Sequence, residues 1–188
     1  MEQEQVNLQV SENVQKAVDY AFDEARQRMS TSEEPLVPFS VMVIDEGLEV
    51  NEHPGASEQE VHDSARYLFA QEMPEGYVLC YDGYVETDDG TKDAVIAEVA
   101  DRGAVTADAL AMLYVHDGDT YVFEPDYGYA GLTPQLYPAG TKPIVSGLAA
   151  LDDEGPDDRD FTDLPEEDDE TSPEGEPQDE GRSGDAIA

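Results

Sequence analysis

The chain has 188 residues, enough for one domain and a tail. Asp and Glu number 46 against 9 Lys and Arg, which gives a formal net charge of −37. Such a field repels phosphate backbones and anionic lipids, so we expect no direct nucleic-acid binding and no membrane binding.

We expect residues 1–10 to be a flexible N-terminus. Ser11 is a suitable N-cap, and the apolar residues that follow it recur at three- and four-residue intervals. This spacing predicts a helix of about 18 residues with one apolar stripe. The stripe comprises Val14, Ala17, Val18, Ala21, Phe22, Ala25 and Met29. The segment 30–35, which ends in a proline, stops the helix.

Residues 36–44 form an apolar run rich in β-branched side chains, which predicts a strand. An Asp-Glu-Gly turn follows, and residues 48–50 can form a short return strand. The sequence Ser57-Glu58-Gln59-Glu60 is a capping box in which Ser57 and Glu60 each satisfy the backbone of the other. It predicts a second helix over residues 58–72, which Pro74 ends.

Two Asp-Gly turns indicate two hairpins, with strands at 77–86 and 92–100 and at 107–115 and 120–124. Residues 107–113 also have helical propensity. The segments 127–131 and 134–143 are rich in Gly and Pro and are expected to be loops. Residues 144–151 can form a last strand or a short helix that closes a domain over residues 11–150.

Residues 151–188 contain 17 acidic and 2 basic residues and few apolar ones. A segment of this composition cannot bury enough apolar surface to offset its chain entropy, so we expect a disordered acidic tail. Residues 1–150 still contain 29 acidic and 7 basic residues, a net charge of −22. The tail therefore does not account for the acidity of the domain.

The order of elements predicts an α+β domain. Its main feature is an antiparallel sheet of four to six strands, four of them in a meander, with both helices on one face.

Residues 35–45, with their Pro-Phe strand, and residues 77–99, with Tyr81-Asp82-Gly83-Tyr84 and Asp93-Ala94-Val95-Ile96-Ala97-Glu98, carry a resemblance. They resemble a group of small bacterial proteins of uncharacterised function that contain a Pro-Phe strand and a YDGY…DAVIVE hairpin. The similarity covers roughly residues 12–135 and implies the same α+β fold. It implies no activity, because its motifs are structural.

No catalytic, cofactor-binding or metal site emerges from the sequence. Cys80 lies in a predicted strand without a nearby His, so it is expected to be an inert core residue, and a single cysteine excludes an intrachain disulfide. His53, His62 and His116 lack zinc-site spacing, and His62 is expected to face solvent. The sequence contains no phosphate-binding loop and no nucleophile motif. We therefore expect no cofactor and favour a non-enzymatic protein.

Three of the ten tyrosines, Tyr127, Tyr129 and Tyr137, fall in segments expected to be loops. Exposed tyrosines are good interface anchors, so these are the candidate partner-contact residues. The alternative is that they pack over one end of the sheet.

The favoured function is a small interaction or regulatory protein whose acidic surface binds a basic partner protein. Three alternatives stay open: acidity selected by a high-salt cytoplasm or a G+C-rich genome, an immunity protein or nucleic-acid mimic, and an enzyme. The N-terminus lacks the basic and apolar regions of a signal peptide, and no stretch is apolar enough to span a bilayer. We expect a cytoplasmic protein. The sequence does not indicate an oligomeric state.

Overall fold

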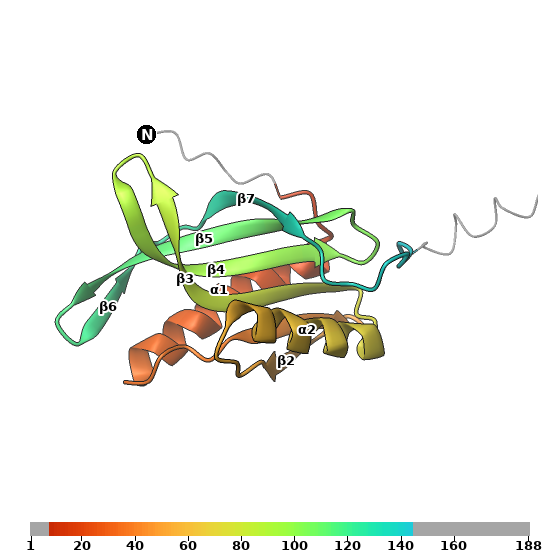
Figure 1. Ribbon diagram of the computed structural model, residues 1–188, viewed down its shortest axis with the longest axis horizontal. Coiled ribbons are helices and arrows are strands. Elements are labelled where there is room, and N and C mark those ends of the chain that lie inside the picture. Colours follow the sequence, from red (N-terminus) through yellow and green to blue (C-terminus); the bar gives the residue numbers. More distant parts are fainter. Residues whose placement is uncertain (1–7, 145–188) are drawn as a thin grey trace, which may run out of the picture. The chain divides into compact units, whose positions relative to one another are not determined.

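The computed structural model describes residues 8–144, and these form two helices and seven strands (Figure 1). The elements, in chain order, are α1 (Glu12–Thr31), β1 (Phe39–Ile44), β2 (Gly47–Glu52), α2 (Glu58–Glu72), β3 (Gly76–Thr87), β4 (Gly90–Asp101), β5 (Thr106–Asp117), β6 (Thr120–Phe123) and β7 (Gly128–Pro134). The expected disordered tail at 151–188, and nearly all of the expected last element at 144–151, lie outside the described residues.

Helix α1 forms as expected. The Ser11 hydroxyl accepts a hydrogen bond from the Val14 amide, and all seven residues of the predicted stripe are buried. Leu8 and Val10, which lie in the segment expected to be a flexible N-terminus, are partly buried and pack against the α1 core.

Helix α2 also begins at its predicted cap. The Glu60 amide donates to the Ser57 hydroxyl at 3.3 Å, whereas the Glu60 carboxylate accepts from the Ala56 amide at 2.7 Å, one residue before the expected donor. The helix ends at Met73, which adopts the left-handed conformation that terminates many helices.

The strands form an antiparallel sheet in the order β2-β1-β3-β4-β5-β6. Strands β3 to β6 make the expected meander, and residues 107–115 lie in a strand. Strand β7 lies where the sequence favours a loop over residues 127–131. It pairs with the N-terminal half of β5 through a register shift at Ala109 and Leu110, and Gly131 on β7 has a φ of 139° at the same place. The bulge explains why a glycine-rich segment can join the sheet.

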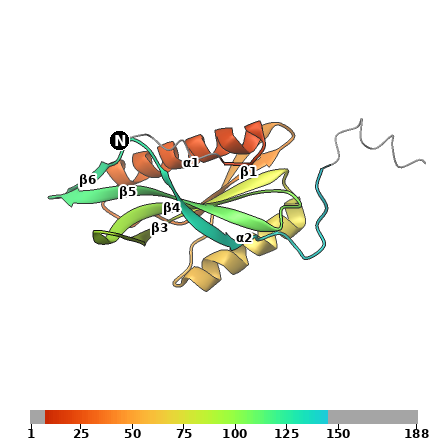
Figure 2. The same cartoon turned by 90° about the horizontal axis from the view of Figure 1, so that it is seen from above.

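The helices cover opposite faces of the sheet, so the expectation that both lie on one face is wrong (Figure 2). Alternate residues of a strand point to opposite faces. Val78 and Cys80 on β3 pack with α1, whereas Tyr77 and Leu79 pack with α2. Strands β1, β3 and β4 contain near-continuous apolar runs because both faces are covered where the helices lie.

The α+β class with an antiparallel sheet is confirmed. Neither helix within residues 8–144 is long and apolar enough to cross a membrane.

Candidate functional site

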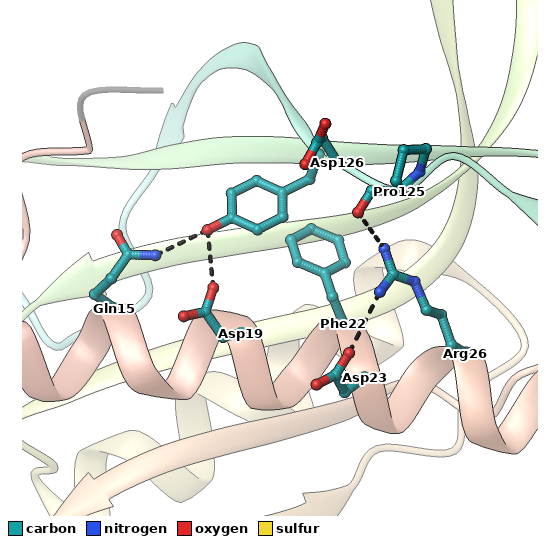
Figure 3. Close-up of a pocket in the computed structure, with 8 residues that line it drawn as sticks. Gln15, Asp19, Phe22, Asp23, Arg26, Pro125 and Asp126 are labelled. Carbon is teal, nitrogen blue, oxygen red and sulfur yellow. Dashed lines mark hydrogen bonds and ion pairs between the residues drawn. The ribbon is translucent and has the colours of Figure 1, made fainter. Parts of the chain in front are cut away.

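A row of polar side chains runs along one side of α1. Gln15, Asp19 and Asp23 follow one another at four-residue steps, which places them in line on the helix surface. Phe22 and Arg26 lie beside them, and the segment 125–127 between β6 and β7 lies opposite. Together these residues line an open pocket with a volume of about 570 Å³ (Figure 3).

Aromatic stacking joins the two walls of this pocket. The Phe22 and Tyr127 rings stack with their centroids 4.6 Å apart. The Tyr127 hydroxyl accepts from Gln15 Nε2 at 2.8 Å and donates to Asp19 Oδ1 at 3.1 Å. Burial raises the pKa of Tyr127, and the Asp19 carboxylate raises it further, so this hydroxyl stays protonated and remains a donor.

Arg26 fastens the segment after β6 to the helix. One terminal nitrogen donates to the backbone carbonyls of Glu124 at 3.1 Å and Pro125 at 2.8 Å. The other lies 3.3 Å from Asp23, and Nε lies 3.0 Å from the Met112 sulfur. The guanidinium is thus engaged on several sides by groups of this chain (Figure 3).

The pocket carries a net negative charge. Three carboxylates line it, from Asp19, Asp23 and Asp126, against the single guanidinium of Arg26. A cationic side chain with an aliphatic stem would find carboxylates for its charge and the Phe22 and Tyr127 rings for its stem. Neither Ser, Cys nor His lines the pocket, so its lining suits binding of a cation better than nucleophilic chemistry.

The three tyrosines named as partner contacts occupy different environments. Tyr127 is half-buried and forms a wall of the pocket, and Tyr129 on β7 is 53% exposed. Tyr137 is only 5% exposed: its ring packs against Tyr77 and Phe69, and its hydroxyl donates to the Pro74 carbonyl at 3.0 Å. Tyr137 is a core residue, as the packing alternative expected, and the partner-contact prediction remains for Tyr127 and Tyr129.

A buried polar cluster lies on the α2 face and was missed by the sequence analysis. His62 is 9% exposed and Glu98 is 3% exposed, and the imidazole Nε2 lies 2.9 and 3.0 Å from the two carboxylate oxygens. Tyr81 donates its hydroxyl to Glu98 Oε1 at 2.8 Å. The expectation that His62 faces solvent is therefore wrong. The signal in the sequence was Glu98, the one charged residue in the apolar run 94–100, because a buried carboxylate requires a partner.

The contacts of His62 favour its charged form. Its Nδ1 lies 2.9 Å from the Glu58 carbonyl, a group that can only accept. The hydrogen bond to Glu98 raises the pKa of His62, and burial opposes this effect. With both ring nitrogens facing acceptors, the imidazolium form satisfies the geometry.

His53 is a second buried histidine with the opposite environment. It lies between two hydroxyls, with Ser40 2.8 Å from Nε2 and Ser64 2.9 Å from Nδ1, and it links β1 to α2. Burial lowers its pKa, so the neutral ring is favoured. Ser40 is fully buried and His53 is 2% exposed, so this group is a structural link.

Cys80 and His116 lie in different environments. Cys80 is fully buried in the α1 core, as expected, and burial raises the pKa of its thiol far above the ordinary value. The exposed His116 on β5 packs edge-on against Tyr114. Within residues 8–144, no three His, Cys, Asp or Glu side chains are grouped in a way that could hold a metal ion.

Comparison of the chain with protein-family models, with curated proteins and with solved structures gives no match.

Proposed function

We propose that this protein is a non-enzymatic interaction protein that binds a basic segment of a partner protein. The pocket between α1 and residues 125–127 would take a Lys or Arg side chain of that segment. The observation that carries the proposal is the charge of the pocket: three carboxylates and one guanidinium line it, and that guanidinium already bonds to Asp23 and to two backbone carbonyls of this chain.

The rest of the domain supports a cationic partner. Residues 8–144 contain 27 Asp and Glu against 7 Lys and Arg, a net charge of −20. Five of those basic side chains lie 2.8–3.8 Å from a carboxylate of this chain, namely those of Lys16, Arg26, Arg28, Arg66 and Lys92. The large excess of carboxylates would steer a basic partner toward the domain and raise its association rate.

The proposal is tested with a fluorescein-labelled peptide, Gly-Ser-Arg-Lys-Arg-Ser-Gly, titrated with the full chain and followed by fluorescence anisotropy. The pocket variant is Asp19→Asn with Asp126→Asn. Its matched control, Glu33→Gln with Glu49→Gln, removes the same charge from exposed positions outside the pocket. Glu49 lies on β2, at the opposite end of the sheet from β6.

We expect the pocket variant to bind about tenfold more weakly and the control variant to change affinity by less than about twofold, because charge-assisted hydrogen bonds require the carboxylates in contact. Equal weakening by the two variants would mean that the peptide responds only to net charge. That result would reject the pocket as the site and favour acidity as an adaptation to the environment.

A further inference from the structure

The ladder between β4 and β5 stops before either strand does. Its last pair is Ala94 with Leu113, yet β4 begins at Gly90 and β5 continues to Asp117. The hairpin of β3 and β4 and the hairpin of β5 and β6 therefore separate, and Figure 1 shows them diverging. We call the opening between residues 90–93 of β4 and residues 114–117 of β5 the fork.

Each hairpin presents one unpaired strand edge to the fork. Residues 90–93 pair with β3 on their other side, and residues 114–117 pair with β6 on theirs. Toward the fork, the described residues give neither stretch a strand partner. An edge of this kind exposes backbone amides and carbonyls at a regular spacing, and an extended chain can pair with it.

The fork is lined by side chains that suit an extended peptide. It holds an open pocket of about 560 Å³ with walls from both hairpins. On one face of β5 and β6, Val115 and Val122 pair across the strands and are 62% and 50% exposed. On the other face, Phe123 packs against Tyr114, which is 5% exposed and donates its hydroxyl to Asp82 at 2.6 Å. Successive residues of an added strand would meet these two faces in turn.

The charges around the fork are complementary to a basic peptide. Asp93 and Glu124 line it. Five further carboxylates stand on or beside the two hairpin turns, at Glu86, Asp88, Asp89, Asp117 and Asp119. Lys92 is the one Lys or Arg in the lining, and its ammonium lies 3.8 Å from Asp89. A strand edge surrounded by acidic residues repels a second copy of this acidic chain and attracts a cationic peptide.

We propose that the fork binds an extended peptide of alternating aliphatic and basic residues, which adds as a strand to the edge of β5 that faces β4. The aliphatic side chains would cover Val115 and Val122, and the basic ones would meet the surrounding carboxylates. This surface shares no lining residue with the α1 pocket, and it goes beyond the proposed function because it recognises the main chain of its ligand as well as its charge.

The probe is a fluorescein-labelled hexapeptide, Arg-Val-Arg-Val-Arg-Val, titrated with the full chain by anisotropy. Two peptides of equal charge serve as comparisons: Arg-Arg-Arg-Val-Val-Val, which lacks the alternation, and the probe with alternate N-methylated amides, which cannot pair along one edge. The protein variant is Val115→Ser. Val105→Ser is its matched control, because Val105 is 91% exposed and lies in the turn at the other end of β5.

We expect Val115→Ser to weaken binding of the probe about fivefold or more, since a valine side chain covered by the peptide loses its apolar contact. Val105→Ser should leave binding unchanged, and both comparison peptides should bind more weakly than the probe. Hydrogen exchange of the amides at 114–117 should slow when the probe is added. Equal binding of the N-methylated peptide, or unchanged exchange at 114–117, would overturn the proposal.

A further variant distinguishes binding at the fork from binding in the α1 pocket. The variant Asp19→Asn with Asp126→Asn should retain Val115-dependent binding of the probe if strand addition occurs at the fork. If that variant abolishes binding of the probe while Val115→Ser has no effect, the peptide sits in the α1 pocket. The fork proposal would then fail while the proposed function stands.

Discussion

The buried pair of His62 and Glu98 makes the stability of the domain depend on pH in a defined direction. The perturbation is Glu98→Gln, which keeps the shape of the side chain and removes its charge. In the wild-type protein the pKa of His62 is raised in the folded state, chiefly by its hydrogen bond to Glu98. The folded state therefore holds a proton that the unfolded chain releases above its ordinary pKa of about 6.5.

The sign and size of the effect follow from this difference. The stabilising contribution of His62 is fully present below about pH 6.5 and is lost as the pH rises through the raised folded-state pKa. Within that window the free energy of unfolding falls by up to about 1.4 kcal/mol for each pH unit. In the Gln variant, His62 loses the anion that contributes most to its raised pKa and keeps only the smaller effects of Glu58, so this fall should become much smaller.

Removing the other partner should cost more. His62→Ala leaves the Glu98 carboxylate buried with only the Tyr81 hydroxyl as its described donor, and an uncompensated buried charge costs about 3–5 kcal/mol. Glu98→Gln allows His62 to become neutral while Nδ1 still donates to the Glu58 carbonyl, so about 1–2 kcal/mol is expected.

The assay is urea unfolding followed by circular dichroism at several values between about pH 6 and 9, a range that brackets the histidine pKa. About 0.5 M KCl should be present to screen repulsion between surface carboxylates. Parallel pH profiles for the wild type and Glu98→Gln would refute the assignment of a charged His62. A larger loss for Glu98→Gln than for His62→Ala would do the same.

Three further predictions concern the core. The pH dependence that His53 contributes has the opposite sign. Burial lowers the pKa of His53, so its contribution to stability is present above about pH 6.5 and is lost as the pH falls. The variant His53→Gln should therefore show a smaller loss of stability at acid pH in the same unfolding assay. Gly76→Ala should destabilise the domain by about 1–3 kcal/mol, because its Cβ would overlap Val14 Cγ2; the control Gly128→Ala, whose Cβ meets open space, should change the midpoint of thermal unfolding little. Cys80 should react with a thiol reagent only as fast as the domain opens, because it is fully buried and its pKa is raised; a rate equal to that of a free thiol would contradict this.

Periodicity and turn chemistry predicted most of the local structure. The apolar stripe of α1, the capping box of α2 and the two Asp-Gly hairpins each depend on residues close together in sequence. The arrangement of the helices does not depend on such local patterns. Tyr77 to Cys80 are all apolar, and such a run indicates burial on both faces without showing which helix covers which face. Strand β7 was missed because its glycines suggest a loop, whereas its pairing depends on a bulge against β5, a distant segment.

The candidate site was predictable only in part. Tyr127 was named from its place in a glycine-rich segment, and it does line the α1 pocket. Its partners Gln15 and Asp19 precede it by 112 and 108 residues, so no local pattern could connect them. Tyr137 comes from a similar segment and is buried instead, because its ring meets Phe69 and Tyr77. Exposure of a loop tyrosine is decided by tertiary contacts that composition does not reveal.

The partners of α1 are synthesised late. The ribosome releases this helix before the segments that it contacts, because Ser11 bonds to Asp101 and Arg26 bonds to the carbonyl of Pro125. A nascent chain that has not reached residue 127 carries an amphipathic helix whose apolar stripe lacks part of its cover. Because these contacts join segments about 90 to 110 residues apart, forming them closes long loops of the chain, which costs conformational entropy. Folding of the domain should therefore complete only after most of the chain has emerged, and α1 is the segment that a holdase chaperone would meet in the interval.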